Sequence, residues 1–414
     1  MIKILIGGSP CTHWSIAQTK HRETEPSGIG WELFENYLIA RDKFCPDYFL
    51  YENNKSMSKS IREEITKRFG FEPICINSAL VSAQNRQRLY WCGKRNLDCT
   101  YSRVDVEQPE DRGILLRDIL ETGVAFNEKG YTLKAQYSKN NISNAFSGHF
   151  PAPMVAEPIR VGTIENSAKN ADFDSQQYRV YSPDGKSVTL CGQGGGVGAK
   201  TGLYACPCEH LSAEYYHGGF DGDLIGMIEN QSVCRNGKQP SQQYRVHTCD
   251  GKAVCVDQDQ RKHYIVPSTG KEVLVYEVRD GHITIKDKQY PIKLEDGCYI
   301  IRKLTVRECM RLQTVPEWYV FPVSDTQAYK MLGNGWTVDV IAHILSHCPG
   351  ITTTPLDVLS MYDGMACGHI ALDKLGAHIA RYRATEIDKY AIKTACHNFA
   401  DIQQLGDAYQ VRDW

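Results

Sequence analysis

The stretch Met1-Ile-Lys-Ile-Leu-Ile-Gly-Gly-Ser-Pro-Cys-Thr-His-Trp-Ser15 decides the fold of this chain. Ile2 to Ile6 predicts a short buried strand, which Gly7-Gly8 ends and Ser9-Pro10 turns toward Cys11. An apolar run of this length, closed by Gly and Pro, is typical of a central parallel strand. Because open α/β sheets place their chemistry in the loops at the carboxyl ends of such strands, Cys11 is the first candidate nucleophile. The alternative is a small core residue, which is the commoner role of a cysteine among apolar neighbours.

The composition is that of an ordinary globular protein. The chain has 414 residues, 42% of them hydrophobic, which is room for two domains or for one large domain with an insertion. A formal net charge of −2 gives no overall basic footprint, although a neutral protein can still carry a locally basic cleft. No stretch resembles a membrane span or a signal peptide, and 16 cysteines without regular spacing predict free thiols in a reducing cytoplasm.

Two further groups of polar residues lie at strand boundaries. Tyr48 to Tyr51 predicts a second buried strand, and Glu52 stands at its carboxyl end. A carboxylate there is costly to bury unless it is paired or used, and the alternative is an exposed strand-end glutamate. Gln84, Arg86 and Arg88 alternate where the chain enters another strand, which puts them on one face. Two arginines on one face suit an anionic ligand, and the alternative is a solvated strand face.

The composition changes near residue 113 and stays changed to about residue 300, with many Gly, Gln, Ser, Tyr and Asp-Gly turns. Ser175 to Val180 recurs as Ser241 to Val246, displaced by 66 positions (241 − 175), which predicts a duplicated hairpin in a β-rich insert. The glycine-rich run from Thr189 to Gly202 predicts a loop close to a ligand, or else a linker. Cys206, Cys208 and nearby histidines lack a matched pair of Cys-x₂₋₄-Cys spacings, so we predict no metal, with zinc as the alternative.

The carboxy-terminal part predicts a nucleoside site. Thr305 to Gln313 is a helix with a capping box, and Gly333-Asn-Gly335 precedes an apolar helix. Asp357 to Gly368 then reads as a strand that runs into a glycine-containing turn, with Glu386 at the end of the next strand and Asp407 at a third. This arrangement is that of Rossmann-like folds, but the glycine spacing does not favour NAD.

Taken together, these residues resemble the DNA (cytosine-5) methyltransferases. Thr12 and Asn54 depart from the family's usual Gln and Val at these positions, and neither is a reacting group. The motifs that carry the resemblance are Gly8-Ser-Pro-Cys11, Tyr51-Glu-Asn53, Gln84-Asn-Arg-Gln-Arg88, Arg302 to Gln313, Gly333-Asn-Gly-Trp336, Ser360-Met-Tyr-Asp-Gly364, Glu386 and Asp407.

The order of these motifs implies a circular permutation, because family members begin with the cofactor motifs, which here come last. The resemblance implies an α/β, Rossmann-like S-adenosylmethionine-dependent methyltransferase fold with a mixed, mostly parallel sheet and helices on both faces. We expect the catalytic domain in two parts, 1–112 and 316–414, around a β-rich target-recognition domain at 113–315. Part of that domain, from Gln176 to Gly202, is similar to the target-recognition segment of bacterial GCGC-type members.

The resemblance also implies the reaction, which is transfer of a methyl group to C5 of a flipped cytosine in a short specific double-stranded DNA site. Cys11 would add to C6, Glu52 would protonate N3, and Arg88 would contact O2. Arg86 would support the loop or a phosphate.

The implied binding residues form two sets, and no metal is expected. S-adenosylmethionine, which leaves as S-adenosylhomocysteine, would contact Pro10, Asn334, Trp336, Tyr362, Asp363, Gly364, Met365, Cys367, Gly368, Glu386, Ile387, Asp407 and Ala408. The DNA would contact Ser9, Gln84, Gln176, Gln177, Arg179, Thr189, Leu190 and Lys200, with Arg179 reading a guanine edge.

We therefore expect a monomer that acts on double-stranded DNA in the cytoplasm of a bacterium or phage-infected host, away from membranes. The sequence allows a restriction endonuclease as a companion. Three alternatives stay open: an RNA cytosine-5 methyltransferase, a catalytically silent DNA-binding regulator, and a cytosine-5 enzyme with another one-carbon donor, such as a hydroxymethylase.

Overall fold

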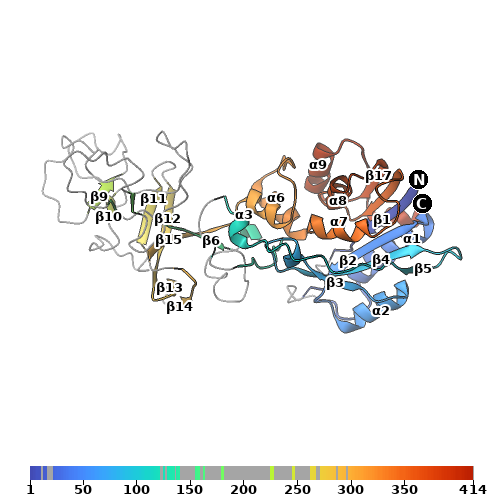
Figure 1. Ribbon diagram of the computed structural model, residues 1–414, viewed down its shortest axis with the longest axis horizontal. Helices are drawn as coiled ribbons and strands as arrows, with labels where there is room; N and C mark the ends of the chain where they lie inside the picture. The colour runs from blue at the N-terminus through green and yellow to red at the C-terminus, as the bar shows by residue number, and fades with distance from the viewer. Residues whose placement is uncertain are drawn as a thin grey trace. The chain divides into compact units, whose positions relative to one another are not determined.

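A computed structural model gives the structure of two compact units (Figure 1). The first unit consists of Met1–Ile119, Lys129–Asn140 and Thr305–Trp414, and the second of Leu120–Glu128 and Asn141–Leu304. These bounds differ from the sequence-based boundaries at 113 and 315, since the helix that follows Thr305 packs in the first unit. The structure describes residues 1–10, 13–15, 22–121, 125, 128–135, 137–139, 154–158, 162–163, 179–180, 224–227, 245–247, 262–266, 271–285, 288–294 and 297–413.

Several predicted site residues lie outside the described residues. They are Cys11, Gln176, Gln177, Thr189, Leu190 and Lys200, together with Cys206 and Cys208 of the alternative zinc site.

The first unit is built on a mixed sheet of strand order β18-β17-β16-β1-β2-β4-β3, with β5 paired to β4. Strands β18, β17, β16, β1 and β2 are parallel neighbours, whereas β3, β4 and β5 join through antiparallel pairs. The predicted central position of the first strand is confirmed, because β1 lies between two parallel neighbours. The strand bounds are β1 (Ile2–Gly7), β2 (Tyr48–Asn54), β3 (Ile74–Asn77), β4 (Gln87–Arg95), β5 (Tyr101–Arg103), β16 (Leu356–Met361), β17 (Ile379–Thr385) and β18 (Ile402–Gly406).

The helices of this unit begin and end at residues suited to these positions. Ser58 accepts a hydrogen bond from the Ile61 amide at the start of α2, and Gly70 ends the helix with φ 83°. The predicted capping box of Thr305 and Glu308 is present at α5. The helix bounds are α1 (Ile29–Phe44), α2 (Lys59–Phe69), α3 (Leu116–Ile119), α5 (Val306–Leu312), α6 (Asp325–Asn334), α7 (Val338–Ser346), α8 (Cys367–Lys374) and α9 (Lys389–Asn398), with the 3₁₀ helix η8 (Ala408–Asp413).

Helices cover both faces of the sheet, as alternation along β1 requires. Leu5 belongs to an aromatic-rich core that includes Phe34 and Phe69 of α1 and α2. Ile6 points to the opposite face, where a Cβ on Gly368 of α8 would lie 2.1 Å from its Cδ1. The glycine at position 368 therefore lets α8 pack closely on the Ile6 side chain.

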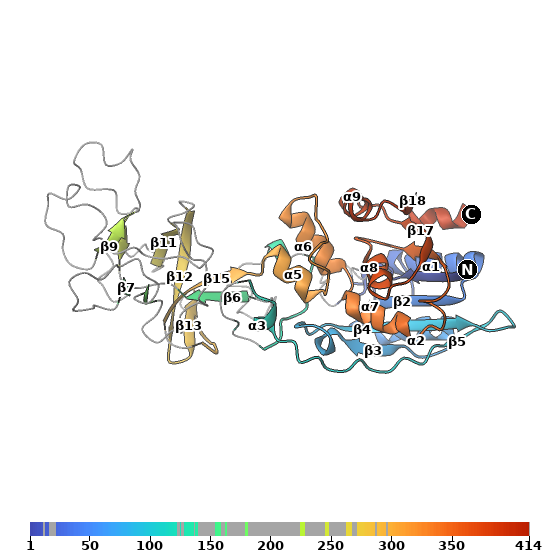
Figure 2. The same ribbon diagram turned by 45° about the horizontal axis from the view of Figure 1, so that its top comes forward.

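The two ends of the chain lie in the same part of the first unit. Strand β16 follows α7 late in the chain but pairs with β1, in the register Ile2 to Leu356 and Gly7 to Met361. Figures 1 and 2 both show the N-terminal and C-terminal ends close to each other, near β1 and β17 in Figure 1 and near β17 and β18 in Figure 2. Among the helices that the structure describes, none has the length and apolar character to cross a membrane.

The second unit contains an antiparallel sheet of order β14-β13-β12-β15-β6, with β11 paired to β12. Both copies of the sequence repeat contribute to further two-stranded antiparallel sheets, the first through β8 on β7 and the second through β10 on β9. The strand bounds are β6 (Met154–Pro158), β7 (Gly162–Thr163), β8 (Arg179–Val180), β9 (Leu224–Met227), β10 (Arg245–His247), β11 (Lys262–Val266), β12 (Lys271–Arg279), β13 (His282–Ile285), β14 (Lys288–Pro291) and β15 (Gly297–Lys303).

Candidate active site

The loop that leaves β1 is held by the end of the neighbouring strand β2. The Asn53 side chain is fully buried, and its amide donates to the Ser9 carbonyl oxygen (3.2 Å) and to the Tyr51 hydroxyl (3.2 Å). The Ser9 and Tyr51 hydroxyls lie 2.7 Å apart, and a Cβ on Gly8 would lie 2.6 Å from the Glu52 carbonyl oxygen. The glycine thus permits a close approach of the two backbones. The Ser9 side chain is 3% exposed and holds the loop, and its expected contact with DNA stays a prediction.

Glu52 is paired, so an exposed strand-end glutamate is the wrong interpretation of this residue. Its side chain is 12% exposed. One carboxylate oxygen, Oε1, lies 3.1 Å from Nε of Arg88, which is on the adjacent antiparallel strand β4. The other oxygen, Oε2, accepts a hydrogen bond from the Trp336 indole Nε1 at 3.0 Å. A carboxylate, a guanidinium and an indole N–H therefore meet beside the loop that leads to Cys11.

Arg86 and Gln84 point into the protein, which corrects the expectation of a shared ligand-binding face with Arg88. The Arg86 guanidinium is buried and donates to the carbonyl oxygens of Leu133 (3.0 Å), Gly333 (3.3 Å) and Gly335 (2.8 Å). Of the two roles expected for Arg86, these bonds fit support of a loop rather than contact with a phosphate. Gln84 is fully buried with its amide bonded to protein groups, so no part of it is exposed for the expected DNA contact.

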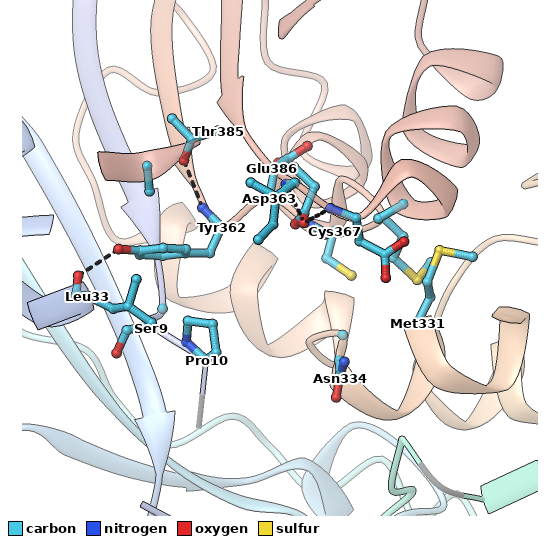
Figure 3. A pocket seen from close by; sticks show the side chains of 18 of the residues that line it. Ser9, Pro10, Leu33, Met331, Asn334, Tyr362, Asp363, Cys367, Thr385 and Glu386 are labelled. Carbon is cyan, nitrogen blue, oxygen red and sulfur yellow. Dashed lines mark hydrogen bonds between the residues drawn. The ribbon is translucent and has the colours of Figure 1, made fainter. Parts of the chain in front are cut away.

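A cavity of about 310 Å³ lies at the carboxyl ends of β1, β16, β17 and β18 (Figure 3). It brings together every residue expected at the cofactor except Gly368, which packs on Ile6 instead. It is also lined by Gly8, Ser9 and Glu52 of the catalytic motifs. The expected residues in the lining are Pro10, Asn334, Trp336, Tyr362, Asp363, Gly364, Met365, Cys367, Glu386, Ile387, Asp407 and Ala408.

Glu386 joins the turn after β16 to the turn after β17. Its Oε2 accepts from the Gly364 amide (2.8 Å), and its Oε1 accepts from the amides of Ile387 and Asp388 (both 2.8 Å). Tyr362 is fixed in the same turn, since its amide donates to the Thr385 hydroxyl at 3.2 Å (Figure 3). The carboxylate at the end of β17 is thereby preorganised at the cavity wall.

Tyr362 and Asp363 give the cavity an aromatic wall and a buried acid. The Tyr362 hydroxyl donates to the Leu33 carbonyl oxygen at 2.7 Å, which holds the ring beside α1 (Figure 3). Asp363 is 9% exposed and accepts from the Tyr382 hydroxyl at 2.7 Å. Burial raises the pKa of Asp363 from 3.8 to about 6, because desolvation disfavours the charged form. A cationic ligand would favour the ionised carboxylate.

Sequence reasoning missed part of the lining. Three of the missed residues are next to predicted ones in the sequence, and this was the only signal for them: Thr385, Asp388 and Tyr409. Leu33 and Lys330 come from α1 and α6, and helical periodicity alone does not show that they face a ligand. Lys330 forms an ion pair with Asp388 at the cavity, with Nζ and Oδ2 2.7 Å apart.

The residues of the cavity fit a nucleoside that carries a positively charged tail. The carboxylates of Glu386 and Asp407 can accept from hydroxyl and amino groups, while Tyr362, Leu33 and Pro10 supply aromatic and apolar surface. Among the described residues, no group of three or more His, Cys, Asp and Glu side chains is placed to hold a metal ion.

Comparisons with known proteins agree with this chemistry. Residues 1–349 match the family model described as C-5 cytosine-specific DNA methylase. Over 380 residues the chain is 22% identical to an orphan methyltransferase of Bacillus phage SPR, covering 82% of this chain and 81% of that protein. A stretch of 40 residues is 58% identical to a type II methyltransferase of Shigella sonnei, covering 10% and 11%. A stretch of 91 residues is 30% identical to a DNA (cytosine-5)-methyltransferase of Oryza sativa subsp. japonica, covering 22% and 15%.

Proposed function

This chain belongs to the C-5 cytosine-specific DNA methylases, and from that premise we propose that it methylates a flipped cytosine in a short specific site of double-stranded DNA. As a member of this family it is a DNA (cytosine-5)-methyltransferase, and its methyl donor is S-adenosylmethionine. The observation that carries the proposal is the shared cavity: Ser9 and Glu52 of the catalytic motifs line it together with Glu386 and Asp407 of the cofactor motifs.

We assign the residues at the carboxyl ends of β16, β17 and β18 to the donor. Glu386 would accept from the ribose hydroxyls, Asp407 would accept from the adenine amino group, and the Tyr362 ring would supply an aromatic surface for the adenine. The turn at Asp363 and Gly364 would hold the methionine part. When bound, S-adenosylmethionine supplies an electrophilic methyl group on a sulfonium centre.

The chemistry on the base is assigned to Cys11, Glu52 and Arg88. C5 of cytosine is too weak a nucleophile alone, so the Cys11 thiolate adds to C6 and makes C5 enamine-like. Addition moves negative charge toward N3 and O2, where Glu52 donates a proton and the Arg88 guanidinium stabilises the oxygen. C5 would accept the methyl group from S-adenosylmethionine, which would leave as S-adenosylhomocysteine. The C5 proton would pass to solvent, and elimination of the Cys11 thiolate, with return of the N3 proton to Glu52, would give 5-methylcytosine. Because C6 is not open to attack within the duplex stack, the base must be flipped out.

We propose that the catalytic domain is circularly permuted. Strand β16, which leads into the cofactor turn, follows residue 349, where the family match ends, yet it pairs in parallel with β1. The proximity of the two ends of the chain supports this proposal, since the segments at these ends would follow one another directly in the family's usual order and must therefore lie close together (Figure 2).

We assign DNA recognition to the insert expected at 113–315. The strands of the second unit and the GCGC-type segment around Gln176, Gln177 and Arg179 support this assignment, with Thr189, Leu190 and Lys200 as further contacts. Arg179 begins strand β8. We further propose that the enzyme acts as a monomer in the cytoplasm of a bacterium or phage-infected host. Its relatives include orphan as well as type II methyltransferases, so a restriction endonuclease is not required as a companion.

Expression in a methylation-deficient bacterium, followed by bisulfite sequencing of the host DNA, tests the proposal. We expect protected cytosines confined to one short motif, and none in a Cys11→Ala control that is expressed to the same level. Complete conversion with folded enzyme would contradict the proposal, and transfer of labelled methyl groups to tRNA rather than duplex DNA would assign the activity to RNA.

A further inference from the structure

We propose that Trp336 is a positioning residue that determines which oxygen of Glu52 carries the proton for the target base. This inference rests on the proposed function, in which Glu52 protonates N3 of cytosine. Trp336 was expected to contact the methyl donor, and it does line the cavity, but its indole also reaches the carboxylate of Glu52.

The two oxygens of Glu52 have different partners. Oε2 faces the indole Nε1 of Trp336 at 3.0 Å, and Oε1 faces the Arg88 guanidinium at 3.1 Å. Both partners are donors only, so neither can accept a proton from a carboxylic acid. An oxygen that accepts an N–H bond cannot carry a proton along the same direction, because two hydrogens would then point at each other. Each oxygen has a second lone-pair direction, so the N–H bond does not by itself bar the proton, but the oxygen whose partner leaves offers both directions and is the favoured site.

Trp336 is fixed through its backbone neighbours. The Gly335 carbonyl oxygen accepts from the buried Arg86 guanidinium at 2.8 Å, and the Thr337 hydroxyl donates to Gln313 Oε1 at 2.9 Å. The Thr337 oxygen also lies 2.9 Å from the hydroxyl of buried Ser78. Trp336 therefore lies in a junction between α6 and α7 that is held on both sides by hydrogen bonds, and these bonds keep its indole N–H in place.

Arg88, by contrast, contacts Oε1 at the end of a long side chain, which can move without a shift of the backbone. In the proposed mechanism its guanidinium moves to O2 of the flipped cytosine, which releases Oε1 when the base arrives. Trp336 stays on Oε2 and keeps the plane of the carboxyl group fixed. The geometry thus assigns the proton to Oε1 and directs it to the base.

The first variant removes the indole N–H together with part of the ring. In Trp336→Phe we expect release of tritium from [5-³H]cytosine in a duplex substrate to slow roughly 10- to 100-fold in single turnovers, the range for loss of one hydrogen bond to a charged group. The affinity for S-adenosylmethionine is measured in parallel by calorimetry, because Trp336 also lines the donor cavity, and a change in that affinity should not account for the slower tritium release. The matched control is Trp318→Phe, at a tryptophan that is 52% exposed and outside the cavity lining.

A second substrate separates positioning from a general structural defect. The ring nitrogen of 5-azacytosine makes C6 more electrophilic, so formation of its covalent adduct depends less on the N3 proton. We expect Trp336→Phe to slow adduct formation on this base much less than tritium release from cytosine. Equal slowing on both bases, or a normal rate on cytosine, would overturn the inference, as would a loss of donor affinity that accounts for the whole defect.

An analogue at position 336 keeps the test decisive if the phenylalanine variant does not fold. Benzothienylalanine replaces the indole N–H with sulfur at nearly constant shape, and we expect the same selective loss on cytosine. A parent enzyme that fails to release tritium or to form the adduct would instead refute the proposed function. If the parent enzyme is active and the variant at position 336 is equally active, the role of Trp336 is refuted while the proposed function stands.

Discussion

Replacement of Asp363 by Asn is expected to stabilise the free protein, because the wild-type carboxyl group is buried in the cofactor cavity. It is 9% exposed, and burial raises its pKa from 3.8 to about 6. Asn is nearly isosteric and can still accept the hydrogen bond that the Tyr382 hydroxyl donates. The substitution removes the charge and retains this contact, but its amide N–H₂ takes the place of Oδ2, which is buried without a hydrogen-bond partner, so part of the gain is lost.

The magnitude follows from the difference between the folded and unfolded pKa of Asp363. The folded state holds the proton of Asp363 more tightly than the unfolded state does. The free energy of unfolding of the wild type, relative to that of Asp363→Asn, is therefore highest below pH 3.8. It loses stability as the pH rises toward about 6 and bears the whole penalty above that pH. A difference of about two units corresponds to about 3 kcal/mol at pH 8, and to about half of that at pH 5. The expected gain of Asp363→Asn is thus largest in alkaline solution.

Urea denaturation at pH 8 and pH 5 measures this gain, with the exposed Asp105→Asn as a control for the loss of one negative charge. Asp363→Asn should also weaken binding of the cationic methyl donor by roughly tenfold, the scale of one charge-assisted contact. A difference in stability between variant and wild type that is the same at pH 8 and at pH 5 would refute the burial argument.

Three further substitutions test the packing around the site by urea denaturation. Gly368→Ala should lower the free energy of unfolding by about 1–3 kcal/mol through its clash with Ile6, and adding Ile6→Val should restore part of it; no rescue would contradict the contact. Arg86→Met should lose about 3 kcal/mol or more, because three backbone carbonyl oxygens lose a charged donor; a loss below about 1 kcal/mol would show that water replaces it. Burial lowers the pKa of His369, but Asp373 and Asp401 beside it outweigh burial, so the pKa is raised. The ionised imidazole therefore stabilises the folded protein fully below about pH 6.5, and this stabilisation is lost as the pH rises. His369→Gln should therefore be more destabilising at pH 6 than at pH 9, and an equal effect at both would exclude the ionised imidazole as the cause.

The sequence alone determined the positions of the elements and the motifs at their ends. Strand alternation and capping motifs are local properties, so β1, β2 and the capping box of α5 could be predicted from neighbouring residues. Strand-end residues such as Glu386 and Asp407 were expected at one site, since the carboxyl ends of parallel strands meet at one edge of a sheet.

Only the tertiary structure decided which side chains of those motifs face the cavity. Arg86 and Arg88 are two positions apart and were expected on one face, yet Arg86 is buried against Gly333 and Gly335 while Arg88 pairs with Glu52. The reason is that residue 86 precedes β4, which begins at Gln87, so the strand alternation does not extend to it.

The hydrogen-bond partner of Glu52 shows most clearly what could not be predicted from the sequence. Its position at the end of β2 could be predicted, but the indole that holds Oε2 comes from Trp336, 284 positions further along the chain. No local pattern encodes that contact, because it depends on how the α6–α7 junction packs over the sheet. A chain fixes its elements through neighbouring residues, whereas the hydrogen bonds of a buried site form only where distant elements meet and exclude water.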